Sequence, residues 1–449
     1  MSAPLLTFSQ ATKFSVKFSE SLAVFKFIQS LTQSAPPNPY SRLFTASAFN
    51  TEQNQKLIHQ FEDIPLNYSY EFPTFPHKNA ADIASLLKQN MVLTESLHEF
   101  KDRSIGLIPL DHLNQIITLI QTFTPIYKQL VFDSSRAVFQ NQLIQIEQLL
   151  VSNNIPSYFE LAKKFYRSSW DSSLAFYIVF YPLPNSQGFT ATAYNNFAES
   201  AIPASLTNYN AVLSVLLHEM AHILCDEEPA EFQVQLREWF DQHPSKYSGF
   251  ARALLQESWA TAVGNGYFAE KLSGKLNAGS WYNFKYISTM AKALYPKVKE
   301  YMDDGRGIDH DFVNHYIKIY EDSFSHWVRE MPNLMSSRDV ISETKADFDT
   351  LDRTYRYWNN KNYYYNFSLE SFEKLKKGFT KFIIIASDNK DKLKIVKKNF
   401  PELKDWQPDV KKDFTCLKFL SDKSALVIIN LVKLTLSEQL KKPIEIIEP

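Results

Sequence analysis

Over the first 150 residues, apolar side chains recur mainly at every third and fourth position, the spacing of helices that bury one face. Residues 14–18 alternate apolar and polar and predict a short strand, and the periodicity of residues 20–31 predicts a helix. A proline-rich break at residues 35–39 follows, after which the helical spacing returns. The pattern predicts a mainly helical N-terminal region over residues 1–160, packed as antiparallel pairs.

A different pattern begins after residue 160. Residues 175–181 form a dense aromatic and β-branched run that predicts a strand, and residues 189–194 follow a turn, which predicts a hairpin. A helix buried on most sides is expected from about residue 211, with Thr207, Asn208 or Asn210 as its cap and Pro229 as its end. The aromatic and proline-bearing segment 65–76 is either a lid over a cleft or, the favoured interpretation, a loop fixed by its rings.

Downstream of this helix the pattern is again helical. Helices are expected at residues 232–240, at 247–272, twice between 281 and 331, and at 338–358, with a polar turn at 359–365. Gly264 and Gly266 fall within the second of these, which favours close backbone approach to a neighbouring helix.

The chain changes character near residue 378. Strand-like runs at 381–386, 415–420 and 425–430, with a basic helix at 391–398, predict a small C-terminal α/β domain over residues 378–449. The expected fold class is therefore α+β and mostly helical, with residues 161–377 as a middle domain.

Composition narrows the possible partners. The chain is 45% hydrophobic and has a formal net charge of -1 with interspersed signs, which makes nucleic acid an unlikely partner. Cys225 and Cys416 are too few and too far apart for a disulfide framework. We expect a soluble protein with no membrane span and no signal peptide, cytoplasmic as written or exported if a signal segment has been removed; the compartment stays unknown.

The chemistry centres on His218-Glu219-Met220-Ala221-His222, which lies inside the apolar helix. Two imidazoles four positions apart project from one helix face, so both can reach one metal ion. In such motifs the glutamate takes a proton from a metal-bound water and passes it to a leaving amine. The alternative, a pair of hydrogen-bonded core histidines, does not account for Glu219 in so apolar a run.

Glu257 lies among apolar residues of the following helical stretch. A carboxylate near an apolar face needs a partner, because burying it unpaired costs several kcal/mol. A metal ion would be such a partner, and an ion pair with Arg252 is the alternative. Glu227 and Glu228 are rival ligands, but they follow His222 too closely to close a tetrahedron and are interpreted as a solvated helix end. Cys225 is interpreted as a core residue.

Together, the motif and Glu257 in its Glu-x-x-Ala context resemble the gluzincin branch of zinc metallopeptidases, over about residues 170–275. The resemblance implies a zincin-like catalytic core, Zn²⁺ held by His218, His222 and Glu257, and a peptide or protein substrate bound along an edge strand. Thr261 stands where the family often has an acid that holds a metal-bound imidazole. The third histidine of the related metzincins is absent.

The branch typically stabilises the oxyanion with a downstream Tyr or His. Tyr355, Tyr357, His315 and His326 are the candidates, and the sequence does not choose among them. The leading hypothesis is zinc-dependent peptide hydrolysis, endo- or exopeptidase, with Glu219 as general base. The alternatives are an inactive binding module that keeps a structural metal, and a chance motif in a helical scaffold.

Overall fold

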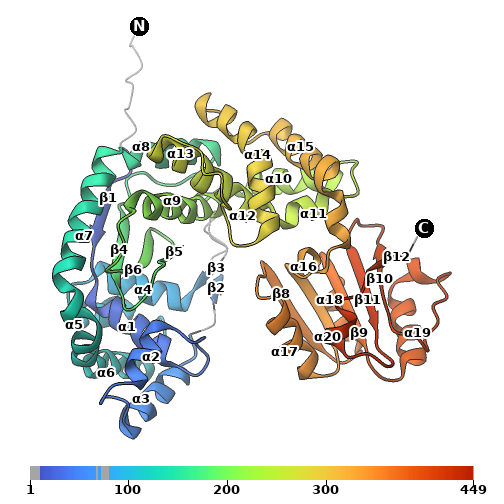
Figure 1. Ribbon diagram of the computed structural model, residues 1–449, viewed down its shortest axis with the longest axis horizontal. Coiled ribbons are helices and arrows are strands. Elements are labelled where there is room, and N and C mark those ends of the chain that lie inside the picture. The colour runs from blue at the N-terminus through green and yellow to red at the C-terminus, as the bar shows by residue number, and fades with distance from the viewer. Residues whose placement is uncertain (1–10, 67–68, 72–79, 448–449) are drawn as a thin grey trace. The chain divides into compact units, whose positions relative to one another are not determined.

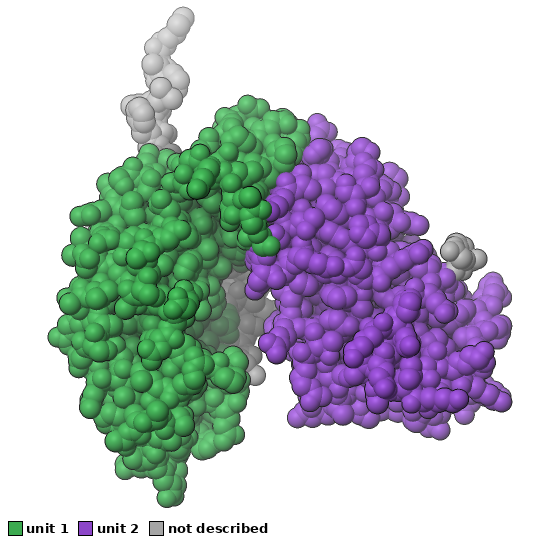
Figure 2. Space-filling model, in the orientation of Figure 1, with its two compact units in different colours: residues 1–233, 259–281, 295–308 green, residues 234–258, 282–294, 309–449 purple. Residues whose placement is uncertain are grey.

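The computed structural model describes residues 11–66, 69–71 and 80–447 of the chain (Figure 1). The described chain is α+β and mostly helical, with two larger mixed sheets, as expected from its sequence. It forms two compact units, green and purple in Figure 2. Unit 1 comprises Met1–Gln233, Trp259–Trp281 and Tyr295–Ile308, and unit 2 comprises Val234–Ser258, Tyr282–Leu294 and Asp309–Pro449. Within the described residues no helix is long and apolar enough to cross a membrane.

The N-terminal part of unit 1 is helical, as its periodicity predicts. Buried side chains of α1, α4 and α6 form one core with residues from one face of a four-stranded sheet. The helices are α1 (Glu20–Leu31), α2 (Pro39–Thr45), α3 (Glu52–Glu62), α4 (Ile83–Leu93), α5 (Leu97–Ser104), α6 (Leu110–Tyr127), α7 (Asp133–Ser152) and α8 (Ile155–Phe165). Most of the segment 65–76 lies outside the described residues; its described part, β2 (Ser69–Glu71), pairs with β3 (Ala80–Asp82).

The four-stranded sheet of unit 1 has the order β1-β4-β6-β5. Strands β1 (Phe14–Lys17), β4 (Phe176–Leu183) and β6 (Phe197–Pro203) are parallel, and β5 (Thr190–Tyr194) is an antiparallel edge strand. The predictions of β1, α1 and β4 are confirmed. The predicted hairpin between the runs 175–181 and 189–194 is wrong, because β5 pairs with β6, a strand that the sequence analysis missed.

The helix that follows, α9 (Tyr209–Asp226), carries the motif of residues 218–222. Asn208, one of the three predicted caps, accepts a hydrogen bond from the Ala211 backbone N–H at 3.1 Å. Most of its side chains are buried, and it packs against β5 and against a downstream helical segment (Figure 1). The predicted buried helix is therefore confirmed.

The stretch predicted as one long helix over residues 247–272 is divided into shorter segments. It consists of α11 (Ser248–Ala253), α12 (Leu255–Ala260), a π-helical segment η2 (Thr261–Phe268) and α13 (Ala269–Ser273). A π-helical segment widens the helix locally and is often found at functional sites. The other predicted helices of this part are present as α10 (Ala230–Gln242), α14 (Lys285–Asp303) and α15 (His310–Ile319), followed by a short α16 (Met331–Leu334).

A six-stranded sheet of order β12-β10-β11-β9-β7-β8 organises the end of unit 2. The predicted strands β9 (Thr380–Ile385), β10 (Phe414–Phe419) and β11 (Ala425–Asn430) and the helix α19 (Asn389–Asn399) are confirmed. The remaining elements are β7 (Ser337–Ser342), α17 (Lys345–Thr354), β8 (Asn360–Tyr365), α18 (Leu369–Leu375), α20 (Leu436–Gln439) and β12 (Glu445–Ile446).

Two predictions near this sheet are wrong. The helix expected over residues 338–358 begins only at Lys345, because residues 337–342 form β7, and the turn expected at 359–365 is β8. Both strands are polar in sequence; Arg338 and Asp339 of β7 are buried and bond to groups that include Asp352 and Tyr364. The sheet therefore reaches back to Ser337, upstream of the boundary placed near residue 378.

Candidate metal centre

The two motif histidines converge on one point. Their Nε2 atoms lie 3.3 Å apart, and their rings are nearly perpendicular at 83°. Two imidazoles bound to one zinc ion at about 2.0–2.1 Å and a tetrahedral angle would hold their nitrogens about 3.3–3.4 Å apart. His218 is buried and His222 is half-buried. The pair therefore has the separation that a shared metal ion requires.

Glu257 supplies a third donor. One ligand atom each from His218, His222 and Glu257 lie within 4.8 Å of one another. Glu257 lies on α12, which runs directly into η2, and η2 packs against α9. Two imidazole nitrogens and one carboxylate oxygen suit zinc and other divalent transition ions, so the donor set fits a metal without selecting zinc alone.

A glycine allows this close helix packing. A Cβ added to Gly264 of η2 would lie 2.5 Å from the Cα and 2.6 Å from the backbone nitrogen of His218. Only glycine lets the two backbones approach this closely, so the predicted close approach is confirmed at Gly264. At Gly266 the neighbours are instead the side chains of Trp281 and Tyr295.

Glu219 follows His218 directly and is half-buried between the buried Leu217 and Met220. It lies on the same helical turn as both imidazoles. Arg252, the alternative partner for Glu257, forms an ion pair with Asp241 instead. Its Nη1 lies 3.2 Å from Asp241 Oδ1.

Among the four oxyanion candidates, Tyr357 lies near Glu257. Burial and then the charge of Glu257 raise the pKa of Tyr357 well above its ordinary value. The Tyr357 ring stacks on Phe284 at 4.1 Å, and Tyr282 hydrogen-bonds to its hydroxyl. Neither Phe284 nor Tyr282 was singled out from the sequence, where no motif marks them.

The other three candidates have different surroundings. Tyr355 lies beside Arg338, and burial raises its pKa to about 12 although the nearby guanidinium opposes that shift. His315 is exposed on α15. His326 is exposed as well and lies 3.8 Å from Glu330. Among the four candidates, Tyr357 is thus the one whose pKa is raised by the charge of a cluster residue, Glu257.

The rival acids at the end of α9 differ from expectation. Glu228 is 1% exposed, so its interpretation as a solvated residue is wrong. Burial and the charge of Asp226 raise its pKa to about 8, while a hydrogen bond from Cys225 opposes the shift. Glu227 is half-buried, and its backbone oxygen accepts hydrogen bonds from the backbone and hydroxyl of Ser169.

Thr261 does not replace the missing acid of the family pattern. Its hydroxyl is fully buried and has no hydrogen-bond partner among the residues that the structure describes. An imidazole bound to a metal usually donates its other N–H to a carboxylate, carbonyl or water, which fixes the ring. Thr261 therefore makes no such contact with either histidine.

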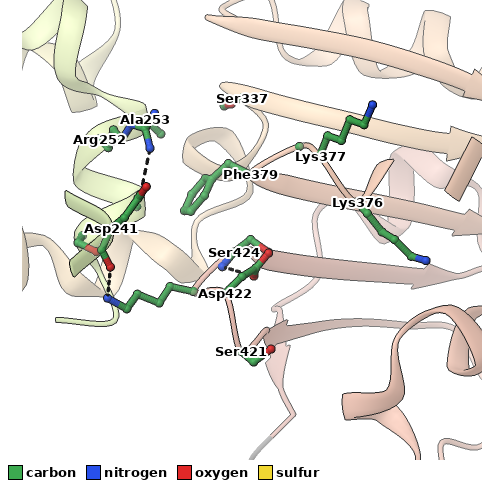
Figure 3. A pocket seen from close by; sticks show the side chains of 14 residues that line it. Asp241, Arg252, Ala253, Ser337, Lys376, Lys377, Phe379, Ser421, Asp422 and Ser424 are labelled. Carbon is green, nitrogen blue, oxygen red and sulfur yellow. Dashed lines mark hydrogen bonds and ion pairs between the residues drawn. The ribbon is translucent and has the colours of Figure 1, made fainter. Parts of the chain in front are cut away.

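A polar cavity of about 690 Å³ in unit 2 was not anticipated (Figure 3). It lies at the amino ends of β7, β9 and β11, whereas open parallel sheets bind ligands at the carboxyl ends. Two of its basic groups have partners: Arg252 pairs with Asp241, and Lys423 Nζ donates to the backbone oxygens of Asp241 and His243. The side chains of Lys376 and Lys377 extend away from Arg252 and Asp241 (Figure 3). Nothing here indicates a ligand.

Comparison with known proteins adds no assignment to this geometry. No family model, curated protein or solved structure matches the chain.

Proposed function

We propose that this protein is a zinc-dependent hydrolase of peptide bonds. The observation that carries the proposal is the convergence of His218, His222 and Glu257 within 4.8 Å, with Glu219 beside the two imidazoles on α9. A purely structural metal site would have no use for an acid at that position. Two nitrogens and one oxygen also leave a fourth position of a tetrahedral ion free for water or substrate.

Each residue then has a defined task. A bound zinc ion would polarise the scissile carbonyl and lower the pKa of a water molecule toward neutrality. The Glu219 carboxylate accepts the proton of the attacking water and passes it to the leaving amine nitrogen. The Tyr357 hydroxyl, close to Glu257, donates a hydrogen bond to the oxyanion.

The edge strand β5 offers a place for an extended substrate. It is antiparallel to β6, has no other strand on its outer side in the described sheet, and packs against α9. The small side chains of Ala191 and Ala193 alternate with Thr190 and Thr192, so they point to the opposite face. A peptide added to this edge by main-chain hydrogen bonds would run alongside the motif helix.

Metal analysis and an unbiased peptide library test the proposal. Purified protein is expected to hold about one zinc ion per chain. His218→Ala should lose the metal, whereas Glu219→Gln should keep it and lower cleavage by roughly 10²–10⁴-fold. Glu227→Gln, at the C-cap of the same helix but outside the cluster, is the matched control and should cleave normally. Absence of stoichiometric metal, or normal cleavage by Glu219→Gln, would refute the assignment.

One observation favours the second hypothesis, a binding module that retains a metal without turnover. Thr261 stands at the position where the gluzincin pattern has an acid, and its hydroxyl makes no hydrogen bond to a histidine. Protein that is fully loaded with zinc but cleaves no member of the library would support this alternative.

A further inference from the structure

A second site is indicated on the face of the unit 1 sheet that packs against α1. A cavity of about 700 Å³ lies there, with walls from β4, β5, β6, α1 and the connection from α1 to α2. This volume is within the range of about 300–1,000 Å³ that is usual for small-molecule sites. None of the residues that line this cavity is one of the three donors of the candidate metal centre.

A buried carboxylate lines this cavity. Glu199, in the interior strand β6, is 2% exposed. Its Oε1 accepts a hydrogen bond from Lys26 Nζ at 3.0 Å and lies 3.6 Å from Lys88 Nζ. Its Oε2 is buried and has no hydrogen-bond partner among the described residues. A buried acceptor left without a donor costs free energy, so a ligand hydroxyl that reaches Oε2 from the cavity would remove this cost.

The charges around Glu199 determine which kind of ligand group can donate a hydrogen bond to its Oε2. Two ammonium groups already surround the single carboxylate, so a cationic ligand would be repelled. An anionic ligand would face the carboxylate oxygen directly. A neutral hydroxyl meets neither penalty, because it can donate to Glu199 Oε2 and accept from another N–H of Lys26, whose ammonium has three donors.

The walls suit a molecule with several hydroxyls on a carbon ring. Tyr40 and Tyr181 are nearly fully buried, and Tyr40 is held by the hydrogen bond from its hydroxyl to the Pro182 oxygen at 2.6 Å. Their rings give apolar surface for C–H groups, and Thr190 and Thr192 add hydroxyls on the β5 side. We propose that this cavity binds a neutral mono- or disaccharide through Glu199 and Lys26.

Saturation-transfer difference NMR with the full chain tests the proposal. The probes are glucose, galactose, mannose, N-acetylglucosamine and the disaccharides of these sugars, with cationic glucosamine and anionic gluconate as charged comparators. At least one neutral sugar should receive saturation, and its affinity should exceed that of its charged relative. Lys26→Met and Thr192→Val should each weaken its binding about tenfold, the loss expected for one hydrogen bond to a ligand.

Two further variants keep the test decisive. Thr190→Trp, at an exposed position on the rim, should fold normally and abolish binding by filling the cavity mouth. Lys128→Met is the matched control for Lys26→Met, because Lys128 also pairs with a glutamate, Glu20, outside the cavity. The proposal is overturned if no neutral sugar binds, if charged relatives bind equally well, or if binding survives Thr190→Trp. Metal loading should not alter these results, which separates them from the test of the peptidase.

Discussion

At the scale of single residues, Gly264 provides a direct test of the packing beneath the metal centre. A methyl group at this position would overlap the backbone of His218. Overpacking of this kind costs typically about 1–3 kcal/mol, and here it would also displace His218, one of the proposed metal ligands. Gly264→Ala should therefore lower both the free energy of unfolding and the zinc affinity, measured by urea denaturation and metal titration.

The control for that substitution is another glycine. A Cβ at Gly188 would meet no atom within 4 Å, and its backbone is not in the left-handed region. Gly188→Ala should change stability by no more than about 0.5 kcal/mol. Equal behaviour of the two variants would mean that the approach of η2 to His218 is not tight.

Glu228 gives a prediction about pH. Its pKa rises from an ordinary value of 4.5 to about 8 on folding, chiefly through burial. The folded state therefore binds more protons than the unfolded state between these values, and stability falls as pH rises through that window. At about 1.4 kcal/mol per pKa unit, the loss is at most about 5 kcal/mol. Urea denaturation at about pH 5 and about pH 9 measures it.

Substitution isolates this contribution. Glu228→Gln should remove this residue's part of the stability loss. The free energy of unfolding of the variant should therefore rise relative to that of the wild type as the pH is raised. Glu231→Gln changes an exposed acid on the next helix and should leave the pH dependence as it is. An unchanged slope in Glu228→Gln would show that Glu228 ionises normally in the folded protein.

The sequence identified the three donors that converge in the structure, but it said less about their surroundings. The spacing of His218 and His222 fixes their common face, because four residues nearly complete a helical turn. The burial of Glu228 follows from tertiary packing that no local pattern records. The link from Tyr357 to Glu257 joins residues one hundred positions apart, so spacing alone could not choose Tyr357 over Tyr355.

At the scale of elements, the missed strands β6 and β7 share one cause. Periodicity identifies strands by apolar or alternating side chains, but β6 contains Glu199 and β7 contains Arg338 and Asp339 in buried positions. Each charge is tolerated because it bonds to partners distant in the sequence, such as Lys26 and Lys88 for Glu199. By contrast, strands β1, β4 and β9, which are rich in β-branched and aromatic residues, were predicted correctly from the sequence.

The stability of β6 should accordingly depend on its ion pairs. Lys88 is 6% exposed, and its Nζ lies 3.6 Å from Glu199 Oε1 and 3.6 Å from the centre of the Tyr194 ring. Lys88→Met leaves Lys26 as the remaining cation and should cost about 3 kcal/mol, the low end for breaking a buried pair. Chemical denaturation of variant and wild type measures the difference.

An exposed ion pair serves as the comparison. Lys56 pairs with Glu52 at 2.9 Å on α3, with its side chain 71% exposed. Lys56→Met should change stability by no more than about 0.5 kcal/mol. If Lys88→Met were equally mild, the pairing of Lys88 with Glu199 would not contribute to the stability of β6.

At the scale of the whole molecule, composition and periodicity predicted the α+β class but not how the chain is shared between units. The sequence suggested consecutive regions 1–160, 161–377 and 378–449, whereas each compact unit is built from three separated stretches. Local patterns show which face of a helix is buried, but they do not show which distant segment covers it. The partition of α14 between the units illustrates this limit.

Metal binding should be visible in the stability of the whole chain. A ligand that binds only the folded state stabilises it by about 2.7 kcal/mol when its free concentration is 100-fold above its dissociation constant. Zinc should therefore raise the urea midpoint relative to chelated protein, whereas Mg²⁺, which prefers six oxygen ligands, should not. Because two units need not unfold in one transition, the transition that shifts must be identified from each probe. His218→Ala and Glu257→Ala should each lose most of the shift, since both donors contribute to one ion. A zinc-induced shift of wild-type size in either variant would place the ion elsewhere and leave His218, His222 and Glu257 as a cluster without a metal.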